Sequence, residues 1–196
     1  MRRDPIVIRS YDPAWPEQFA AERDRIAPSF SGWVTRDIEH MGSTAVPGLA
    51  AKPIVDMLAV VDDVTRCADP ARLLAEAGWV HAPEPFDAAE RKLSFCTPDA
   101  AWRTHHLHVV EEASDGWRGW LAFRDYLCAD SGAASEYAAL KVRLAAEHGA
   151  DPNERDAYRA GKAAFVRAIT DRALAAGLPH LVPARETGSG TAGPRE

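Results

Sequence analysis

Two histidines and one aspartate are the residues of this sequence best suited to chemistry. His106 and His108 stand two positions apart in an extended run, so both side chains share one face of a predicted strand. Asp56 lies in the apolar run 54–61, where a buried strand should not hold an unpaired charge. Imidazoles bind divalent metals and a carboxylate completes such a site, so the pattern predicts a metal site at Asp56, His106 and His108. A buried salt bridge at Asp56 and a hydrogen-bonded structural histidine pair are the alternatives.

A turn of small residues precedes the Asp56 strand. It consists of Gly42, Ser43 and Thr44. Glycine lets the backbone approach a ligand closely, and the serine hydroxyl and the N–H groups of the turn can hold a phosphate oxygen. The sequence therefore predicts a phosphate-binding turn, although an ordinary tight turn explains the same residues.

Three predicted helices in the C-terminal half each place one cation beside an apolar face. Each cation follows an aromatic residue by four positions, about one helical turn. Convergence of the three faces would form an anion pocket of phosphate size, whereas snorkelling of long side-chain stems explains each cation separately. The three pairs are Trp120 with Arg124, Tyr137 with Lys141, and Tyr158 with Lys162.

The hydrophobic pattern predicts an α+β fold in which strands and helices mix first and helices alone follow. The β-branched run 54–61 is typical of a strand buried on both faces. Residues 1–178 are expected to form one domain, and the Gly-, Pro-, Ser- and Thr-rich residues 179–196 a disordered tail. The other expected strands are 6–8, 34–41, 79–80 and the hairpin 92–97 with 102–111. One helix is expected after Asp12-Pro13 and one from Asp69-Pro70 to Gly78, and three more are expected at 115–129, 134–148 and 152–176.

Composition excludes several classes of protein. The chain has 196 residues, 46% of them hydrophobic and 27% charged, which is ordinary for a globular protein. A net charge of −6 without a basic run argues against a nucleic-acid partner. The longest apolar run is too short to cross a membrane, and no secretory signal follows the first residues. Three widely spaced cysteines do not form a disulfide framework, so we expect a cytoplasmic location.

Several segments resemble the GrpB family, whose members are similar to the DNA polymerase beta-like nucleotidyltransferase superfamily. The longest match is the run HMGSTAVPGL at residues 40–49, and the resemblance extends over roughly residues 7–173. The other matching segments are AKPIVD at 51–56, HLHV at 106–109, FRDYL at 123–127, Tyr137 with Lys141, and Tyr158 with Lys162.

The resemblance implies a nucleotidyltransferase-like mixed sheet core with a C-terminal helical layer. In the superfamily, a D-x-D pair and a third carboxylate hold two magnesium ions that align a nucleoside triphosphate. Here the first position is Asp56, the second is Leu58, and the third falls in the strand of His106 and His108. Magnesium prefers oxygen ligands, so this departure argues against nucleotidyl transfer and suits a single zinc or manganese ion better.

The resulting hypothesis is a nucleotidyltransferase-like protein that binds a nucleotide or another phosphorylated small molecule, with a divalent metal such as magnesium, manganese or zinc. Asp56 and His106 are its candidate catalytic residues. Some family members are fused to dephospho-coenzyme A kinase, which suggests a non-catalytic regulatory or chaperone-like module with a protein partner as one alternative. A metal-dependent phosphohydrolase is another. The candidate ligand-binding residues are Gly42, Ser43, Thr44, Lys52, Arg124, Lys141, Tyr158 and Lys162.

Overall fold

A mixed five-stranded sheet forms the centre of the computed structural model, which describes residues 5–181. The strand order is β1-β2-β5-β4-β3, with β2 and β5 parallel and the other neighbours antiparallel. The fold is therefore α+β with a mixed sheet, as the sequence predicts. The strands are β1 (Glu39–Met41), β2 (Val55–Val61), β3 (Val80–His81), β4 (Lys92–Pro98) and β5 (Arg103–Glu111).

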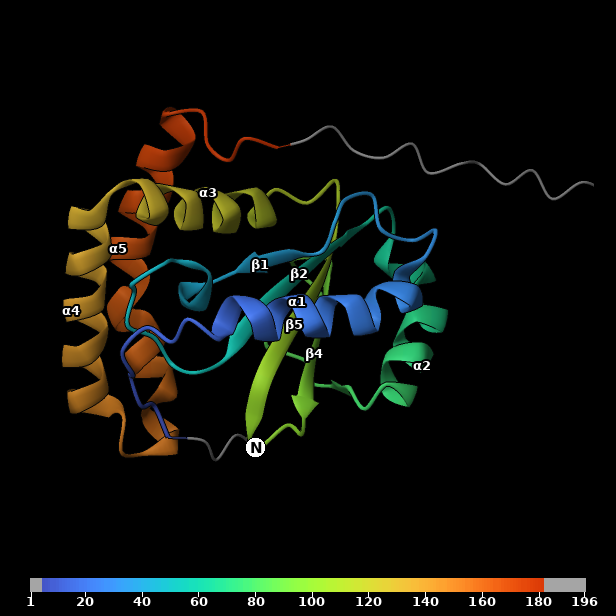
Figure 1. Ribbon diagram of the computed structural model, residues 1–196, viewed down its shortest axis with the longest axis horizontal. Coiled ribbons are helices and arrows are strands. Elements are labelled where there is room, and N and C mark those ends of the chain that lie inside the picture. Colours follow the sequence, from blue (N-terminus) through green and yellow to red (C-terminus); the bar gives the residue numbers. More distant parts are fainter. Residues whose placement is uncertain (1–4, 182–196) are drawn as a thin grey trace, which may run out of the picture.

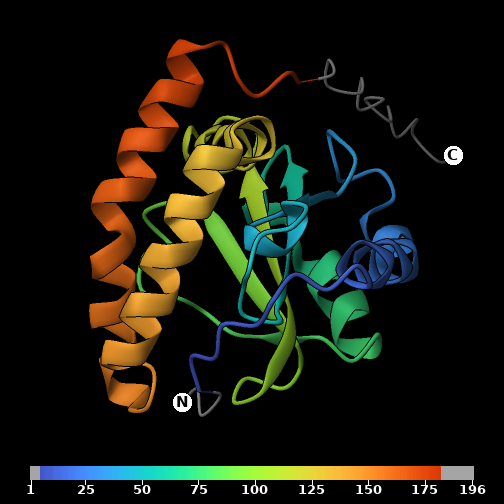
Figure 2. The same cartoon turned by 60° about the vertical axis from the view of Figure 1, so that its left-hand side comes forward.

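Helices cover both faces of this sheet, as Figures 1 and 2 show. The first two helices lie on one face, where odd-numbered residues of β2 such as Met57 enter a core with Trp15 and Leu74. On the other face, Leu58 packs against Trp117 of the third helix. The helices are α1 (Trp15–Ile26), α2 (Ala68–Glu76), α3 (Gly116–Ala129), α4 (Ser131–His148) and α5 (Arg155–Ala175).

The C-terminal helices form a layer of their own beside the sheet (Figure 2). Asp130 caps α4 by accepting a hydrogen bond from the backbone N–H of Ala133. α4 and α5 approach closely at Gly161, because a Cβ atom there would lie 2.5 Å from Leu144. This layer packs onto the loop after β1 through Val46 and Leu49.

Two predicted strands are absent or shortened in the structure. Residues 6–8 form no strand: Arg9 makes an isolated bridge to Ala51, and Ile6 is buried against Leu144 and Tyr158 instead. Of the predicted strand 34–41, only Glu39–Met41 pairs as β1, with a single bridge at Val34. In both places apolar residues pack into the core while the backbone makes only isolated hydrogen bonds, such as those from the N–H of Ile6 to Gly149 and from the N–H of Thr35 to Val60. The hydrophobic pattern does not distinguish this arrangement from a paired strand.

The predicted tail at 179–196 falls mostly outside the described residues. Within its first three residues, the apolar side chain of Leu181 is partly buried against the core around Trp117. Across residues 5–181, no helix combines the length and apolar character that a membrane span requires.

Candidate functional site

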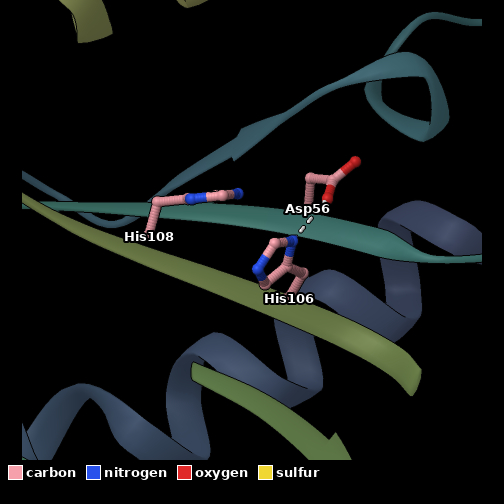
Figure 3. Close-up of side chains that lie close together, drawn as sticks. All are labelled: Asp56, His106 and His108. Atoms are coloured by element: carbon pink, nitrogen blue, oxygen red, sulfur yellow. Dashed lines mark ion pairs between the residues drawn. The ribbon is translucent and has the colours of Figure 1, made fainter. Parts of the chain in front are cut away.

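The central pair of strands brings the predicted metal ligands together. β2 and β5 run in parallel with Asp56 opposite His106 and Leu58 opposite His108, so the two histidines and Asp56 face the helical layer. The Oδ1 atom of Asp56 lies 3.6 Å from Nδ1 of His106, the contact that is dashed in Figure 3. The ring centroids of His106 and His108 are 4.1 Å apart. One possible ligand atom from each of the three side chains lies within 4.8 Å of the other two.

The donor set fits a divalent metal. Within the described part of the chain, no hydrogen-bond partner reaches the buried Nδ1 atom of His108. A buried nitrogen without a partner is costly, and a metal ion or a ligand would remove that cost. One carboxylate and two imidazoles suit zinc or manganese better than magnesium. Desolvation, followed by the neighbouring His106, lowers the pKa of His108 well below its usual value, so its imidazole is in the neutral form that binds metals.

Asp56 is held in its ionised form by its surroundings. Burial alone would raise the pKa of this carboxyl, but its contact with His106, with smaller contributions from His108 and Lys52, lowers the pKa overall. The carboxylate is therefore charged at neutral pH and able to bind a cation.

The turn after β1 lies directly against Asp56. Gly42 has a φ angle of +72°, and a Cβ atom at this position would lie 2.5 Å from Oδ2 of Asp56. Glycine is thus required both by the backbone conformation and by the close approach of the carboxylate. The hydroxyl of the buried Thr44 contacts Nε2 of His40 at 3.0 Å and donates to the carbonyl of Ile54, so it ties the turn to the strands.

Two lysines from α4 and α5 complete the other side of the site. Lys141 Nζ lies 4.6 Å from the centre of the Tyr137 ring, and Lys162 Nζ lies at the same distance from Tyr158. Lys141 also donates a hydrogen bond to the carbonyl of Ala50. Burial, with the nearby charges of Lys162 and Lys52, lowers the pKa of Lys141 to about 7, and burial lowers that of Lys162 to about 8.

These lowered pKa values predict that stability rises between pH 7 and 9. Unfolded lysine keeps its proton up to about pH 10.4, so the unfolded chain binds more protons than the folded chain in this range, and the free energy of unfolding increases with pH. Urea unfolding at both pH values measures the rise. It is expected to be smaller in Lys141→Met, and unchanged in Arg143→Met on the exposed side of α4. Equal rises in Lys141→Met and the wild type would contradict the assignment.

A cavity of about 280 Å³ collects these groups between the sheet, the turn and the helices. It contains the three candidate metal ligands and all but one of the candidate ligand-binding residues. The cationic and phenolic groups stand opposite the carboxylate and the imidazoles. The predicted residues that line it are Gly42, Ser43, Thr44, Lys52, Asp56, His106, His108, Lys141, Tyr158 and Lys162.

Arg124 is the predicted residue that does not line this cavity. Its guanidinium forms ion pairs with Glu39 at 2.9 Å and with Asp125 at 2.7 Å, and it donates to the carbonyl of His40. Glu39 and Asp125 thus neutralise Arg124, which helical periodicity predicts as a ligand-binding cation. Arg124 therefore connects α3 to β1, the strand that precedes the Gly42 turn, without lining the cavity.

Sequence reasoning missed two charged residues that line the site, Glu84 and Arg159, and one phenol, Tyr137. Glu84, in the loop after β3, lies 3.8 Å from Nε2 of His106, 3.3 Å from Arg103 and 3.5 Å from Arg159. Tyr137 lines the cavity through its ring. Its spacing to Lys141 signals its position, whereas no local pattern signals Glu84.

The second position of the superfamily's carboxylate pair is part of the hydrophobic core. Leu58 is fully buried against Trp117 and Leu121 of α3, on the same face of β2 as Asp56. No carboxylate of the strand therefore stands next to Asp56, and a pair of magnesium ions lacks its usual ligands.

Comparisons with known proteins agree with this arrangement. A family model described as "GrpB protein" matches residues 5–172. The glutamate-rich protein GrpB of Alkalihalophilus pseudofirmus is 32% identical over 173 residues, covering 86% of this chain and 96% of that protein. A dephospho-CoA kinase of Mycolicibacterium paratuberculosis is 30% identical over 195 residues, which cover 87% of this chain and 46% of the kinase.

The same architecture is found in a crystal structure of the conserved protein GrpB from Enterococcus faecalis. That structure aligns with a TM-score of 0.77 and 30% identity, covering 87% of this chain and 99% of the other. The mixed sheet, its helical layer and the sequence matches all lead to one family. The chain belongs to the GrpB family.

Proposed function

We propose that the cavity binds a phosphorylated small molecule together with one divalent metal ion. The observation that supports this most strongly is the opposition of two clusters in one space: Asp56, His106 and His108 on the sheet, and Lys141 and Lys162 on the helices. Metal ions and lysine ammonium groups both neutralise phosphate oxygens in proteins.

Each residue has a definite role in this proposal. Asp56, His106 and His108 would hold the metal, which when bound supplies a positive charge beside the phosphate. Lys141 and Lys162 bind phosphate oxygens from the opposite side, and the Gly42 turn offers its backbone at close range. These groups fix the orientation of the phosphate.

The volume of the cavity limits what it can enclose. At about 280 Å³ it is at the lower end of small-molecule sites, so it accommodates a phosphate group with a small attached part and leaves a larger body outside. The ligand class is therefore a phosphate ester or a nucleotide of which the phosphate end is bound.

A non-catalytic regulatory module is the second candidate function. The buried Leu58 stands where the superfamily has its second carboxylate, which favours a protein that binds its ligand without transferring a nucleotide. Such a protein would sense a phosphorylated metabolite and act on a protein partner. The similarity to part of a dephospho-CoA kinase suggests coenzyme A precursors as ligands to test.

The test is a thermal-shift screen of the purified chain. Nucleotides, coenzyme A precursors and sugar phosphates are each added with magnesium, manganese or zinc. A ligand at a hundredfold excess over its Kd stabilises the fold by about 2.7 kcal/mol, which raises the melting temperature measurably. Metal-dependent shifts that disappear in Asp56→Asn support the proposal, whereas no shift across the panel contradicts it. Release of inorganic phosphate from a bound ester would identify a phosphohydrolase.

Phosphate binding at pH 8 is expected to take up protons. A phosphate monoester is a dianion at this pH, and it raises the pKa of Lys141 and Lys162, which are partly neutral in the free protein. Calorimetry with AMP in two buffers of different ionisation enthalpy should show uptake on the order of one proton. The uptake should fall in Lys162→Met and persist in Arg143→Met. Binding without proton uptake would show that these lysines do not contact the phosphate.

A further inference from the structure

A second and larger cavity lies beside the proposed phosphate site. It has a volume of about 780 Å³ and runs between α3 and α5. Gly119 allows the two helices to approach here, because a Cβ atom at that position would lie 3.2 Å from Thr170. Ala163, Val166 and Leu174 contribute an apolar wall, and Leu174 is 47% exposed.

Three residues make this groove continuous with the phosphate site. Arg159 and Lys162 line both cavities. Trp120 lines the groove, and its ring lies 5.5 Å from that of His108, which lines the smaller cavity. A molecule whose phosphate end is in the smaller cavity therefore has a direct way into the groove, past two cations and along an aromatic ring.

From this continuity we infer that the groove between α3 and α5 binds the uncharged aromatic or apolar body of the phosphorylated ligand. The inference rests on the proposed function and narrows its ligand class to amphipathic phosphate esters, in which a flat or apolar group is attached to the phosphate. A purely polar sugar phosphate would leave the wall of Val166 and Leu174 in contact with water. An aromatic body would bury that wall and stack near Trp120.

The charges at the groove fit this occupant better than a second copy of the chain. The protein carries a net charge of −6, and the cations Arg159 and Lys162 stand where the groove meets the phosphate site. They favour an anionic end at that junction. Beyond it the groove is lined by two further arginines and two aspartates, whose charges balance and suit a body without net charge: Arg118, Arg167, Asp115 and Asp171.

Two matched ligands and two matched variants test the inference. Calorimetry in the presence of manganese compares methyl phosphate with 1-naphthyl phosphate, which carry the same phosphate and differ in the attached body. Ala163→Trp fills the groove from an exposed position of α5. Ala164→Trp adds the same side chain one residue further on, at an exposed position outside the groove.

We expect 1-naphthyl phosphate to bind the wild type and Ala164→Trp at least about tenfold more tightly than methyl phosphate. In Ala163→Trp this advantage should disappear while methyl phosphate binds as before. Equal affinities in the wild type, or an advantage that survives Ala163→Trp, would overturn the inference and leave the proposed function standing. Failure of both esters to bind would overturn the proposed function and the inference with it. A dimer in sedimentation that Ala163→Trp dissociates would show that a second copy occupies the groove, which also overturns the inference.

Discussion

Replacing Asp56 with asparagine is expected to weaken zinc or manganese binding by about 100-fold or more, a larger loss than the 10- to 100-fold typical of residues that only support a metal ligand. Asparagine has the same shape but no charge, so the cavity keeps its form. His106 and His108 remain, yet two neutral imidazoles do not compensate the positive charge of the ion as a carboxylate does. Equilibrium dialysis or calorimetry with each metal measures the change.

The matched control is Asp62→Asn, an exposed aspartate directly after β2. It removes the same charge from the chain without approaching the cavity, so its metal affinity should equal that of the wild type. An unfolding transition at the wild-type temperature would show that Asp56→Asn is folded. Unchanged metal affinity in folded Asp56→Asn would remove Asp56 from the site.

Substituting alanine at Gly42 is expected to destabilise the fold by about 2 to 4 kcal/mol. About 1 to 3 kcal/mol comes from the backbone, because a φ of 72° with a ψ of −170° lies in a region essentially confined to glycine. The rest comes from overpacking, because the new Cβ would lie 2.5 Å from Oδ2 of Asp56. The turn or the carboxylate must then move, so metal affinity should fall as well. Urea unfolding and metal titration of the same sample measure both effects.

Gly48→Ala separates the two contributions. Gly48 has a φ angle of +77°, but a Cβ atom added at this position would meet no other atom within 4 Å, so only the backbone strain applies there. Gly48→Ala should cost about 1 to 2 kcal/mol and leave metal binding unchanged. If both variants lose the same stability and neither loses metal affinity, the turn does not position the carboxylate.

The sheet and the helical layer could be predicted well from the sequence because their patterns are local. The β-branched run of β2 and the alternation in β5 place Asp56, His106 and His108 on strands, and the period of two already predicts that the histidines share a face. Ile6 illustrates the limit. Its burial against Leu144 depends on the position of α4 in the tertiary structure, whereas the local sequence pattern predicts a strand.

The candidate site could be predicted where one residue type implies one environment. The aromatic residue four positions before Lys141 and Lys162 predicts that each cation lies beside the apolar face of its helix, and in the structure each ammonium lies against that aromatic ring. Arg124 has the same spacing, but Glu39 lies within reach across the fold and neutralises it. Glu84 enters the site from a loop, and its position depends on contacts with Arg103 and Arg159 that no local pattern encodes.

A crystal structure of the protein soaked with manganese and a phosphate monoester tests the central claim most directly. Anomalous scattering locates the metal independently of its surroundings. We predict one anomalous peak within about 2.0 to 2.5 Å of a carboxylate oxygen of Asp56 and of a nitrogen of both His106 and His108, with the phosphate between it and Lys162. A cavity without metal or phosphate under these conditions, or a metal bound by other residues alone, would contradict the account.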